Sequence, residues 1–560
     1  MVTFPILLRP LSIIACLFRS LLLVLFAGQA SAEQPFSFAT TPGQLPKTVM
    51  PVHYALDIKP DFDRLSFTGT EIVDIDVAAP AANQLVLNAV DLTIENASID
   101  GDTLPSTAIM LDAAAETLTL SLPHPISMGR HQLSVTYAGR INRFGRGLFM
   151  VDYPTAAGRR RMISSHLEPT DARRIFPNWD EPAFKASLSL AVTVAQEFLA
   201  VSNMPVAHEE SLDFATKRVT FHSTPAMSSY LFVLAAGELE RITSKVDGVT
   251  VGVVTARGKG MEGRYALQSA TELLRYYNGY FGVAYPLPKL DLIAVPGGFG
   301  GAMENWGGIT FFESRLLYDP AASAADVRRD IFSALAHEMA HQWFGDLVTT
   351  AWWDNLWLNE GFASWMESKV AERLHPEWHT WLNGSGRKDA AMSEDARRTS
   401  HPIQQPIVNE SEARAAFDYI TYIKGQAFLR MLENYLGEDA FAAGIRVYMR
   451  DHAFSNATTA DLWHALDQAS GKAVTAIASA YTEQPGVPLV VAQAICRDGV
   501  QRIGLRQERF TIHDPAPLPQ RWQVPVAFSG AATGTILLDG AHVEAQAACR
   551  QAPRPWRQYL

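Results

Sequence analysis

The spacing of apolar residues changes twice along the chain. Between about residues 52 and 234, apolar and polar residues alternate over short runs, which is typical of half-buried β-strands. After residue 260, apolar residues recur every three or four positions, which predicts helices over residues 265–280, 327–345, 360–374 and 425–436. Alternation returns after about residue 486, in the segments VPLVVAQAI, RIGLRQERF, WQVPVAF and GTILLDG. The pattern therefore predicts an α+β protein in which a mostly helical region lies between two β-rich regions.

These changes of pattern also suggest how the chain divides into domains. A length of 560 residues, of which 48% are apolar and 19% charged, is typical of a globular protein with several domains. We expect a β-rich N-terminal domain over residues 33–240, a mostly helical domain over 241–480 and a β-sandwich-like domain over 481–560.

The first 32 residues have the pattern of a secretory signal peptide. Arg9 and Arg19 precede a short apolar run, and the small residues Ala30 and Ala32 form a cleavage pattern. An alternative is a bacterial lipobox, which would attach a lipid to Cys16. We expect export to the periplasm or the exterior and no stable membrane span, because the apolar run is too short to cross a bilayer.

Charge and cysteine content narrow the possible partners. The formal net charge is −11 and the only run of three basic residues is at 159–161, so we expect no nucleic-acid partner. Cleavage of the signal peptide would leave Cys496 and Cys549, between which a disulfide is chemically possible in an exported chain. The sequence contains no CxxC pair to bind zinc through sulfur.

The segment ALAHEMAHQWFGD places charged residues inside an apolar helical pattern. His337 and His341 are four residues apart, so on a helix they project from the same face, and Glu338 completes an HExxH motif. A pair of core histidines bonded to backbone carbonyls is the simpler alternative. A nucleophilic triad is disfavoured because no GxSxG segment is present. A zinc site requires a third protein ligand and leaves a fourth position open.

Glu360 is the candidate for that third ligand. It follows His341 after eighteen residues, at the start of the next predicted helix, where it could instead be an acid favoured by the helix dipole. Two packed helices joined by such a loop could bring Glu360 to both imidazoles. One zinc ion would then be held by His337, His341 and Glu360, with Glu338 as general base.

At this point the chain resembles a known family. It carries HEMAHQWFG, WLNEGFA and GGAMENWGGITF, and also VHYALDIKPD, LEPTDARRIFPNWDEPAFKA, TPAMSSYLF, YPLPKLDLIAVP and FDYITYIKGQAFLRML. In this order the segments cover most of residues 50–470, and they resemble the aminopeptidase N family of zinc metallopeptidases. The resemblance implies a β-rich N-terminal saddle domain, a thermolysin-like catalytic domain and a small β-sandwich. The C-terminal helical domain of the family is expected to be absent from this chain.

The resemblance also implies roles for individual residues. The family's GAMEN motif binds the free amine of the substrate and its backbone, and corresponds here to Gly301, Ala302, Met303, Glu304 and Asn305. Glu304 would hold the substrate ammonium and share it with Glu168. His166 stands where the family usually has Gln, and would touch the first residue of the substrate. Tyr422 would stabilise the oxyanion.

We therefore expect a zinc-dependent aminopeptidase that removes the N-terminal residue of peptides with a free amine. An epoxide hydrolase-like member of the same family is one alternative, although such an enzyme has Gln in place of Glu168. A peptide-binding scaffold without catalytic activity is another. The sequence indicates neither the preferred first residue nor the oligomeric state.

Overall fold

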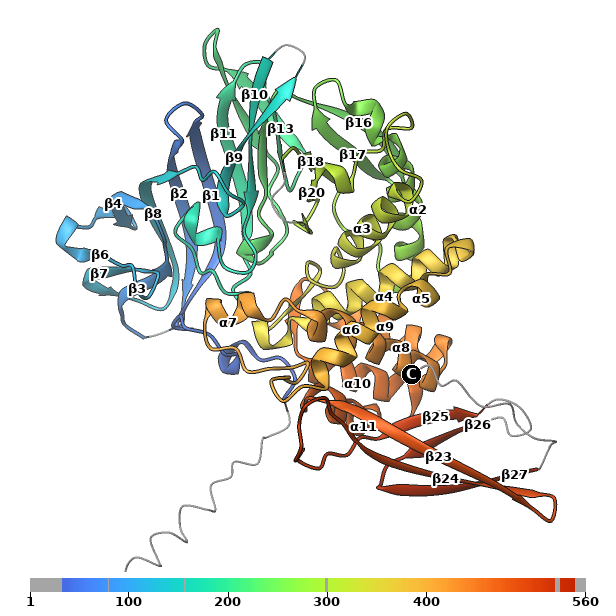
Figure 1. Cartoon of the computed structure of the whole chain (residues 1–560). Helices are drawn as coiled ribbons and strands as arrows, with labels where there is room; N and C mark the ends of the chain where they lie inside the picture. The colour runs from blue at the N-terminus through green and yellow to red at the C-terminus, as the bar shows by residue number, and fades with distance from the viewer. Residues whose placement is uncertain (1–32, 79, 156–157, 298–300, 529–533, 549–560) are drawn as a thin grey trace, which may run out of the picture. The chain divides into compact units, whose positions relative to one another are not determined.

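The computed structural model describes residues 33–548 except 79, 156–157, 298–300 and 529–533 (Figure 1). The expected signal peptide, the lipidation candidate Cys16 and Cys549 lie outside the described residues. Among the helices of the described part, none is long and apolar enough to cross a membrane.

The N-terminal part of the chain is built from β-strands, as the alternating pattern predicts. An eight-stranded sheet has the order β13-β14-β11-β1-β2-β8-β4-β5. Its strands are β1 (Val49–Asp61), β2 (Ser66–Val77), β4 (Thr93–Ile99), β5 (Asp102–Thr103), β8 (Gly129–Arg140), β11 (Ser187–Ala195), β13 (Val206–Ser211) and β14 (Thr216–Phe221). Every second residue of β2 is buried from Phe67 onward, so one face of this strand packs into the core.

Two smaller sheets complete this part. A three-stranded sheet consists of β3 (Ala82–Asn88), β7 (Thr117–Ile126) and β6 (Ile109–Asp112). A four-stranded sheet has the order β12-β15-β10-β9 and consists of β9 (Gly147–Thr155), β10 (Gly158–His166), β12 (Leu199–Ser202) and β15 (Leu234–Gly237). Strand β10 ends at His166, and the four residues before His166 are buried, so the loop that carries Glu168 begins at the buried end of the strand.

A mixed five-stranded sheet precedes most of the helices. Its order is β16-β17-β18-β20-β19, with β16 (Leu239–Val246), β17 (Val249–Ala256), β18 (Lys289–Val295), β19 (Ala302–Met303) and β20 (Gly308–Phe312). All seven residues of β18 are buried, as expected for a central strand. Strand β19 carries part of the GAMEN segment and forms the edge of the sheet.

The helical region follows this sheet. Its helices are α2 (Arg264–Phe281), α3 (Val327–His341), α4 (Trp357–Leu374), α5 (Thr380–Asn383), α6 (Ser385–Asp395), α7 (Glu410–Ala415), α8 (Gly425–Leu436), α9 (Glu438–Asp451), α10 (Thr459–Ser470) and α11 (Val474–Thr482). A two-stranded sheet of β21 (Val348–Thr350) and β22 (Ser455–Ala457) joins the segment after α3 to the segment after α9. Helix α3 packs against α4, which brings the two motif-bearing helices together.

Two helix boundaries differ from the sequence pattern. Helix α3 ends at His341 rather than near residue 345, because the chain turns there and Gly345 has φ 132°, a conformation that glycine adopts far more readily than other residues. Helix α4 begins at Trp357 rather than at residue 360. Its first turns are buried on every side, so no polar face marks the start of the helix.

A single π-helical turn, Ile420–Lys424, connects α7 to α8. At the start of α8, Gly425 approaches Gly361 of α4 so closely that a Cβ on Gly425 would lie 3.2 Å from the Gly361 Cα atom. Larger residues at these positions would push the two segments apart. The glycine pair therefore lets the π-helical turn lie directly beside the helix that carries Glu360.

The C-terminal part returns to β-structure, as predicted. One sheet consists of β23 (Val487–Arg497), β24 (Val500–Phe510) and β27 (His542–Ala548), and the other of β25 (Val524–Phe528) and β26 (Gly534–Leu538). Cys496 is disulfide-bonded, and its partner lies outside the described residues.

Candidate active site

The two histidines of the HExxH motif lie one above the other on α3. Their ring centroids are 4.8 Å apart, as expected for residues one turn apart on the same helix face. His341 Nδ1 is 3.0 Å from the Phe344 carbonyl oxygen and donates to it. This bond fixes the orientation of the ring, so the lone pair of a neutral His341 is on Nε2.

Glu360 faces both rings from the first turn of α4. Its Oε2 atom is 3.2 Å from His337 Nε2 and 3.5 Å from His341 Nε2. One donor atom from each of the three residues lies within 4.8 Å of the others, so these atoms surround a single point. The structure thus brings together the three residues that the sequence predicts as metal ligands.

The electrostatics of this group favour positive charge. Burial lowers the pKa of His341, but the charge of Glu304 and the contact with Glu360 outweigh it and raise the pKa to about 9. Burial lowers the pKa of His337, but the contacts with Glu360 and Glu367 outweigh it and raise the pKa well above its ordinary value. Conversely, burial raises the pKa of Glu360, but the two histidines lower it below the usual carboxyl range.

Glu338 lies beside the ligand group without being part of it. Together with Glu304 and His341 it forms a second set of atoms within 4.8 Å of one another. Burial raises the pKa of Glu338 to about 7, although the charges of both histidines act in the opposite direction. A carboxylate with such a pKa is suited to accept and return a proton near neutral pH.

The GAMEN segment runs along the edge of the five-stranded sheet. Ala302 and Met303 pair with β20 on one side, and β19 has no neighbouring strand on the other among the described residues. Gly301 has φ 143°, and a Cβ there would meet no atom of the described residues within 4 Å, so the backbone is open toward this part of the structure. The buried Asn305 amide donates to the carbonyl oxygens of Met303 and Gly308, which holds the turn after β19.

Two buried acids face the site from different sheets. Glu304 follows β19 and is 3% exposed, with Oε1 3.8 Å from His341 Nδ1. Glu168 follows β10 and is 8% exposed. Among the described residues, the Oε1 atoms of both acids are buried without a hydrogen-bond partner. The pKa of Glu168 is raised well above its usual range by burial and then by the charge of Glu304.

Tyr422 belongs to the π-helical turn, and its ring is stacked on that of His337 with centroids 6.0 Å apart. Burial raises the pKa of its phenol well above the usual value, and nearby carboxylates act in the same direction. The hydroxyl therefore keeps its proton at neutral pH and can donate a hydrogen bond.

His166 is influenced by other charged residues than the histidines of the HExxH motif are. Burial lowers its pKa to about 4, and the charged groups that act on it are Asp171, Arg414 and Arg146 rather than the ligands of the candidate metal group. The imidazole is therefore neutral at neutral pH.

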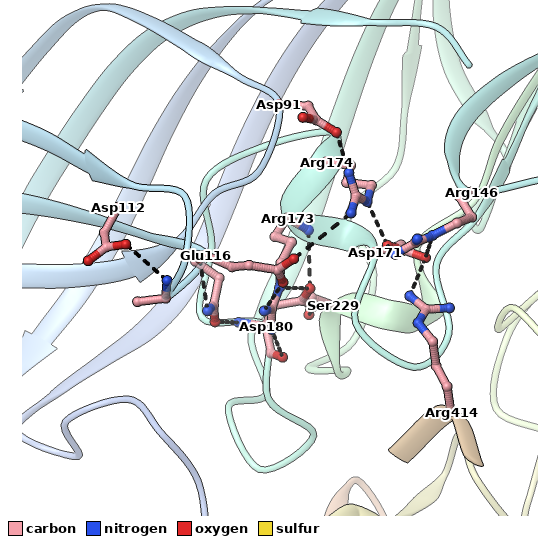
Figure 2. A network of polar contacts seen from close by, with 12 residues as sticks. Asp91, Asp112, Glu116, Arg146, Asp171, Arg173, Arg174, Asp180, Ser229 and Arg414 are labelled. Atoms are coloured by element: carbon pink, nitrogen blue, oxygen red, sulfur yellow. Dashed lines mark hydrogen bonds and ion pairs between the residues drawn. The ribbon is translucent and has the colours of Figure 1, made fainter. Parts of the chain in front are cut away.

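A network of ion pairs supports the loop that carries Glu168 (Figure 2). Asp171 is 1% exposed and accepts hydrogen bonds from Arg146, Arg174 and Arg414, at 2.7 to 3.0 Å. Arg414 comes from α7, so this carboxylate joins the loop after β10 to the segment that leads to Tyr422.

The neighbouring Arg173 is buried in the same network. It donates to Asp180 at 3.0 Å and to Glu116 at 2.9 Å, and Asp180 also accepts from Ser229 at 2.7 Å (Figure 2). These contacts fix the two ends of the segment from 173 to 180 against each other.

Sequence reasoning missed several polar residues around the site. Glu367 Oε2 is 3.5 Å from His337 Nδ1, on the side of the ring opposite Glu360. Its position seven residues after Glu360, two turns along the same helix, was the available signal. Asp346 is fully buried, and the Lys185 ammonium donates to its carbonyl oxygen at 3.4 Å. No sequence pattern marked that pair.

Comparison with known proteins gives consistent matches. Residues 265–481 match the peptidase family M1 domain, and residues 50–231 match the peptidase M1 N-terminal domain. The chain is 47% identical over 342 residues to aminopeptidase N of Acetobacter pasteurianus, covering 61% of this chain and 96% of that protein. It is 38% identical over 485 residues to aminopeptidase M1-B of Oryza sativa subsp. japonica, covering 86% of this chain and 54% of the rice protein. For aminopeptidase M1 of Arabidopsis thaliana the identity is 37%, over 86% of this chain and 55% of the relative. The chain thus spans about half the length of these plant relatives.

Proposed function

The chain belongs to peptidase family M1, and we propose that it is a zinc-dependent aminopeptidase acting on peptides with a free N-terminus. The observation that carries this proposal is the pair of buried acids, Glu168 and Glu304, beside the group formed by His337, His341 and Glu360. Each acid has a buried oxygen without a hydrogen-bond partner among the described residues. The ammonium group of a peptide is a cation with several donors, so it could satisfy both oxygens at once.

The residues present fit a zinc ion. Two imidazoles and one carboxylate are a common ligand set of catalytic zinc, and they leave a coordination position open. The bond from His341 Nδ1 to the Phe344 carbonyl orients Nε2 toward Glu360, as a ligand requires. When bound, zinc supplies Lewis-acid polarisation and makes a water molecule easier to deprotonate.

Glu338 transfers the proton of the reaction, and Tyr422 stabilises the negative charge that develops. Glu338, with a pKa of about 7, accepts a proton from the attacking water and returns it to the leaving amine. Tyr422 keeps its proton because the pKa of its phenol is raised, so its hydroxyl can donate to the oxyanion that develops on the attacked carbonyl.

The edge strand β19 positions the substrate. An extended peptide would add to the free edge at Gly301 and Ala302, while Glu304 and Glu168 hold its ammonium group. Because the amine is fixed at a set distance from Glu338, only the first peptide bond would reach the reacting groups. This arrangement gives removal of one residue at a time.

The test is a screen of aminoacyl fluorogenic substrates with the purified full chain. We expect turnover that is lost on treatment with a chelator and restored by zinc, and no turnover of the N-acetylated forms. Glu338→Gln is the matched variant: it should keep its zinc but lose at least ~10²-fold of the turnover, because only the general base is removed. Efficient cleavage of an acetylated substrate, or chelator-resistant turnover, would overturn the proposal.

A further inference from the structure

We propose that Asp418, held by His401, is a positioning residue that fixes the π-helical turn carrying Tyr422. The proposal rests on the proposed function, because it assigns Asp418 and His401 a role in orienting the phenol that donates to the oxyanion. It arises from the contacts of the turn itself.

Asp418 organises the start of the π-helical turn from both its side chain and its backbone. Its Oδ1 atom accepts from the backbone N–H groups of Ile420 and Thr421, at 2.9 and 3.1 Å. Its carbonyl oxygen accepts from the N–H of Tyr422 at 3.1 Å. Three successive residues up to and including Tyr422 are thus bonded to one aspartate. Isolated π-helical turns are rare and frequently lie at functional sites.

His401 holds the other oxygen of the same carboxylate. His401 Nε2 is 2.6 Å from Asp418 Oδ2, and His401 Nδ1 is 2.7 Å from the Pro402 carbonyl oxygen. Both ring nitrogens therefore face oxygen acceptors, an arrangement in which a doubly protonated imidazole donates at each end. Burial lowers the pKa of His401, but the hydrogen bond to Asp418 outweighs it and raises the pKa, while Lys424 opposes this effect.

A second ion pair holds the far end of the turn. Lys424, its last residue, lies 2.9 Å from Asp395 Oδ2, at the end of α6. Asp395 Oδ1 accepts from Ser400 Oγ at 2.6 Å and from the Gly486 N–H at 2.7 Å. Residues 395–401 thus hold the π-helical turn at both ends. At the start of the turn the segment supplies the cation, His401, and at its end it supplies the anion, Asp395.

The position of Tyr422 follows from these two attachments. The turn is only five residues long, so a shift of Asp418 moves the backbone N–H of Tyr422 directly. A misplacement of a reacting group by about 1 Å can cost on the order of 10²-fold in rate. Loss of the carboxylate should therefore reduce kcat while leaving zinc and the amine-binding acids in place.

A double-mutant cycle with Tyr422→Phe tests this role. We expect Asp418→Ala to lower kcat by roughly 10- to 100-fold with little change in KM, and to cost less than about twofold further in the Tyr422→Phe background. His401→Gln, which keeps a hydrogen-bond donor but loses the charge, should show a smaller loss of the same kind. Losses that multiply in the double variant would overturn the proposal, since Asp418 would then act independently of Tyr422.

Amide hydrogen exchange provides a measurement that does not depend on turnover. Asp418→Ala should speed exchange at residues 420–422, whereas the matched control Asn409→Ala should affect only α7, where the Asn409 side chain accepts from the Glu412 N–H. Unchanged exchange at residues 420–422 would overturn the proposal. An unmodified protein that hydrolyses no aminoacyl substrate would instead contradict the proposed function, and exchange would still decide whether Asp418 holds the turn.

Discussion

Glu367 supports His337 from the side of the ring that faces away from the other candidate ligands. Its Oε2 atom is 3.5 Å from His337 Nδ1, a distance at which a modest movement completes a hydrogen bond when zinc binds. Such a partner fixes the orientation of a metal-binding imidazole. We predict that Glu367→Gln lowers zinc affinity by about 10-fold and Glu367→Ala by up to about 100-fold.

Competition with a chromophoric chelator would measure these affinities. Glu372→Gln is the matched control, because Glu372 lies on the same helix but accepts from the Trp381 N–H instead of a histidine. Zinc affinity in Glu367→Ala equal to that of the control would show that His337 needs no support from this side.

At the residue scale, spacing along the chain predicts which residues of one helix lie together, but it does not predict contacts between distant segments. His337 and His341 could be placed on one helix face from their separation alone, and their rings are indeed 4.8 Å apart. Asp418 and His401 carry no motif by which residue reasoning could join them. Their contact depends on how α6 and the π-helical turn pack, which the local pattern of the chain does not encode.

Strand β2 contains a buried acid that its alternating pattern does not explain. Glu71 is 0% exposed, and among the described residues neither of its carboxylate oxygens has a hydrogen-bond partner. Burial raises the pKa of Glu71 well above its usual value. The folded protein therefore binds a proton here more tightly than the unfolded chain. Between the unfolded and folded pKa values, the free energy of unfolding falls as pH rises.

We predict that Glu71→Leu raises the free energy of unfolding at pH 8 by about 1–3 kcal/mol, because the buried carboxyl group is removed. The gain should shrink as pH falls toward the unfolded carboxyl pKa, because the cost of the raised folded pKa disappears there. Denaturant titrations at several pH values measure both effects. Glu95→Leu on β4, where the acid is exposed, serves as the control, and an equal gain there would contradict the explanation by burial.

The contact of α7 with the loop after β10 should affect stability in a pH-dependent way. Burial raises the pKa of Asp171, but Arg146, Arg414 and Arg174 outweigh it and lower the pKa. The stabilisation is therefore present above the unfolded carboxyl pKa and lost as pH falls through the lower folded value. We predict that Asp171→Asn costs roughly 1–3 kcal/mol at pH 7, because a buried acceptor of three arginines loses its charge while two of those arginines stay partly solvated.

Arg414→Ala provides the graded comparison. Its side chain is 35% exposed, so the expected cost is only about 1 kcal/mol or less. Thermal unfolding at pH 7 and pH 4 measures both variants. A cost for Asp171→Asn no larger than that for Arg414→Ala would contradict the view that this aspartate is the centre of the network.

At the element scale, periodicity predicted the order of strands and helices but not all of their boundaries. The pattern over residues 425–436 coincides with α8, whose apolar stripe is clear against a polar face. The periodicity of apolar residues missed the first turn of α4, because Trp357, Leu358 and Asn359 are all buried. Which strands pair also lay beyond the pattern, as in the parallel pairing of β1 with β11 across more than a hundred residues.

Across the whole molecule, the site gathers buried acids from separate elements. Glu168 follows β10, Glu304 follows β19, Glu338 lies on α3 and Asp346 follows that helix. The pKa of each is raised, first by burial and then in part by the charges of neighbouring carboxylates, with Glu338 at about 7. Without a metal ion, the folded protein must neutralise these groups with protons.

The sign of the pH effect follows from those raised pKa values. A raised carboxyl pKa means that the zinc-free protein becomes more stable as pH falls from 8 toward 5. Zinc supplies positive charge without protons, but at low pH protons compete with it for His337 and His341. The protonation of the buried acids and the competition at the histidines both reduce the stabilisation by zinc as pH falls. We therefore predict that the stabilisation by zinc is largest near pH 8 and decreases steadily toward pH 5.

Calorimetry of zinc-loaded and zinc-free protein across this pH range measures the difference directly. With free zinc at about 1,000 times its Kd, the stabilisation near pH 8 should reach about 4 kcal/mol. Glu168→Gln should flatten the pH dependence of the zinc-free form, because one of the acids no longer titrates, while leaving all three candidate ligands intact. A zinc-induced shift in Tm that stays constant, or grows, as pH falls would show that zinc binding is not coupled to the protonation of the buried acids.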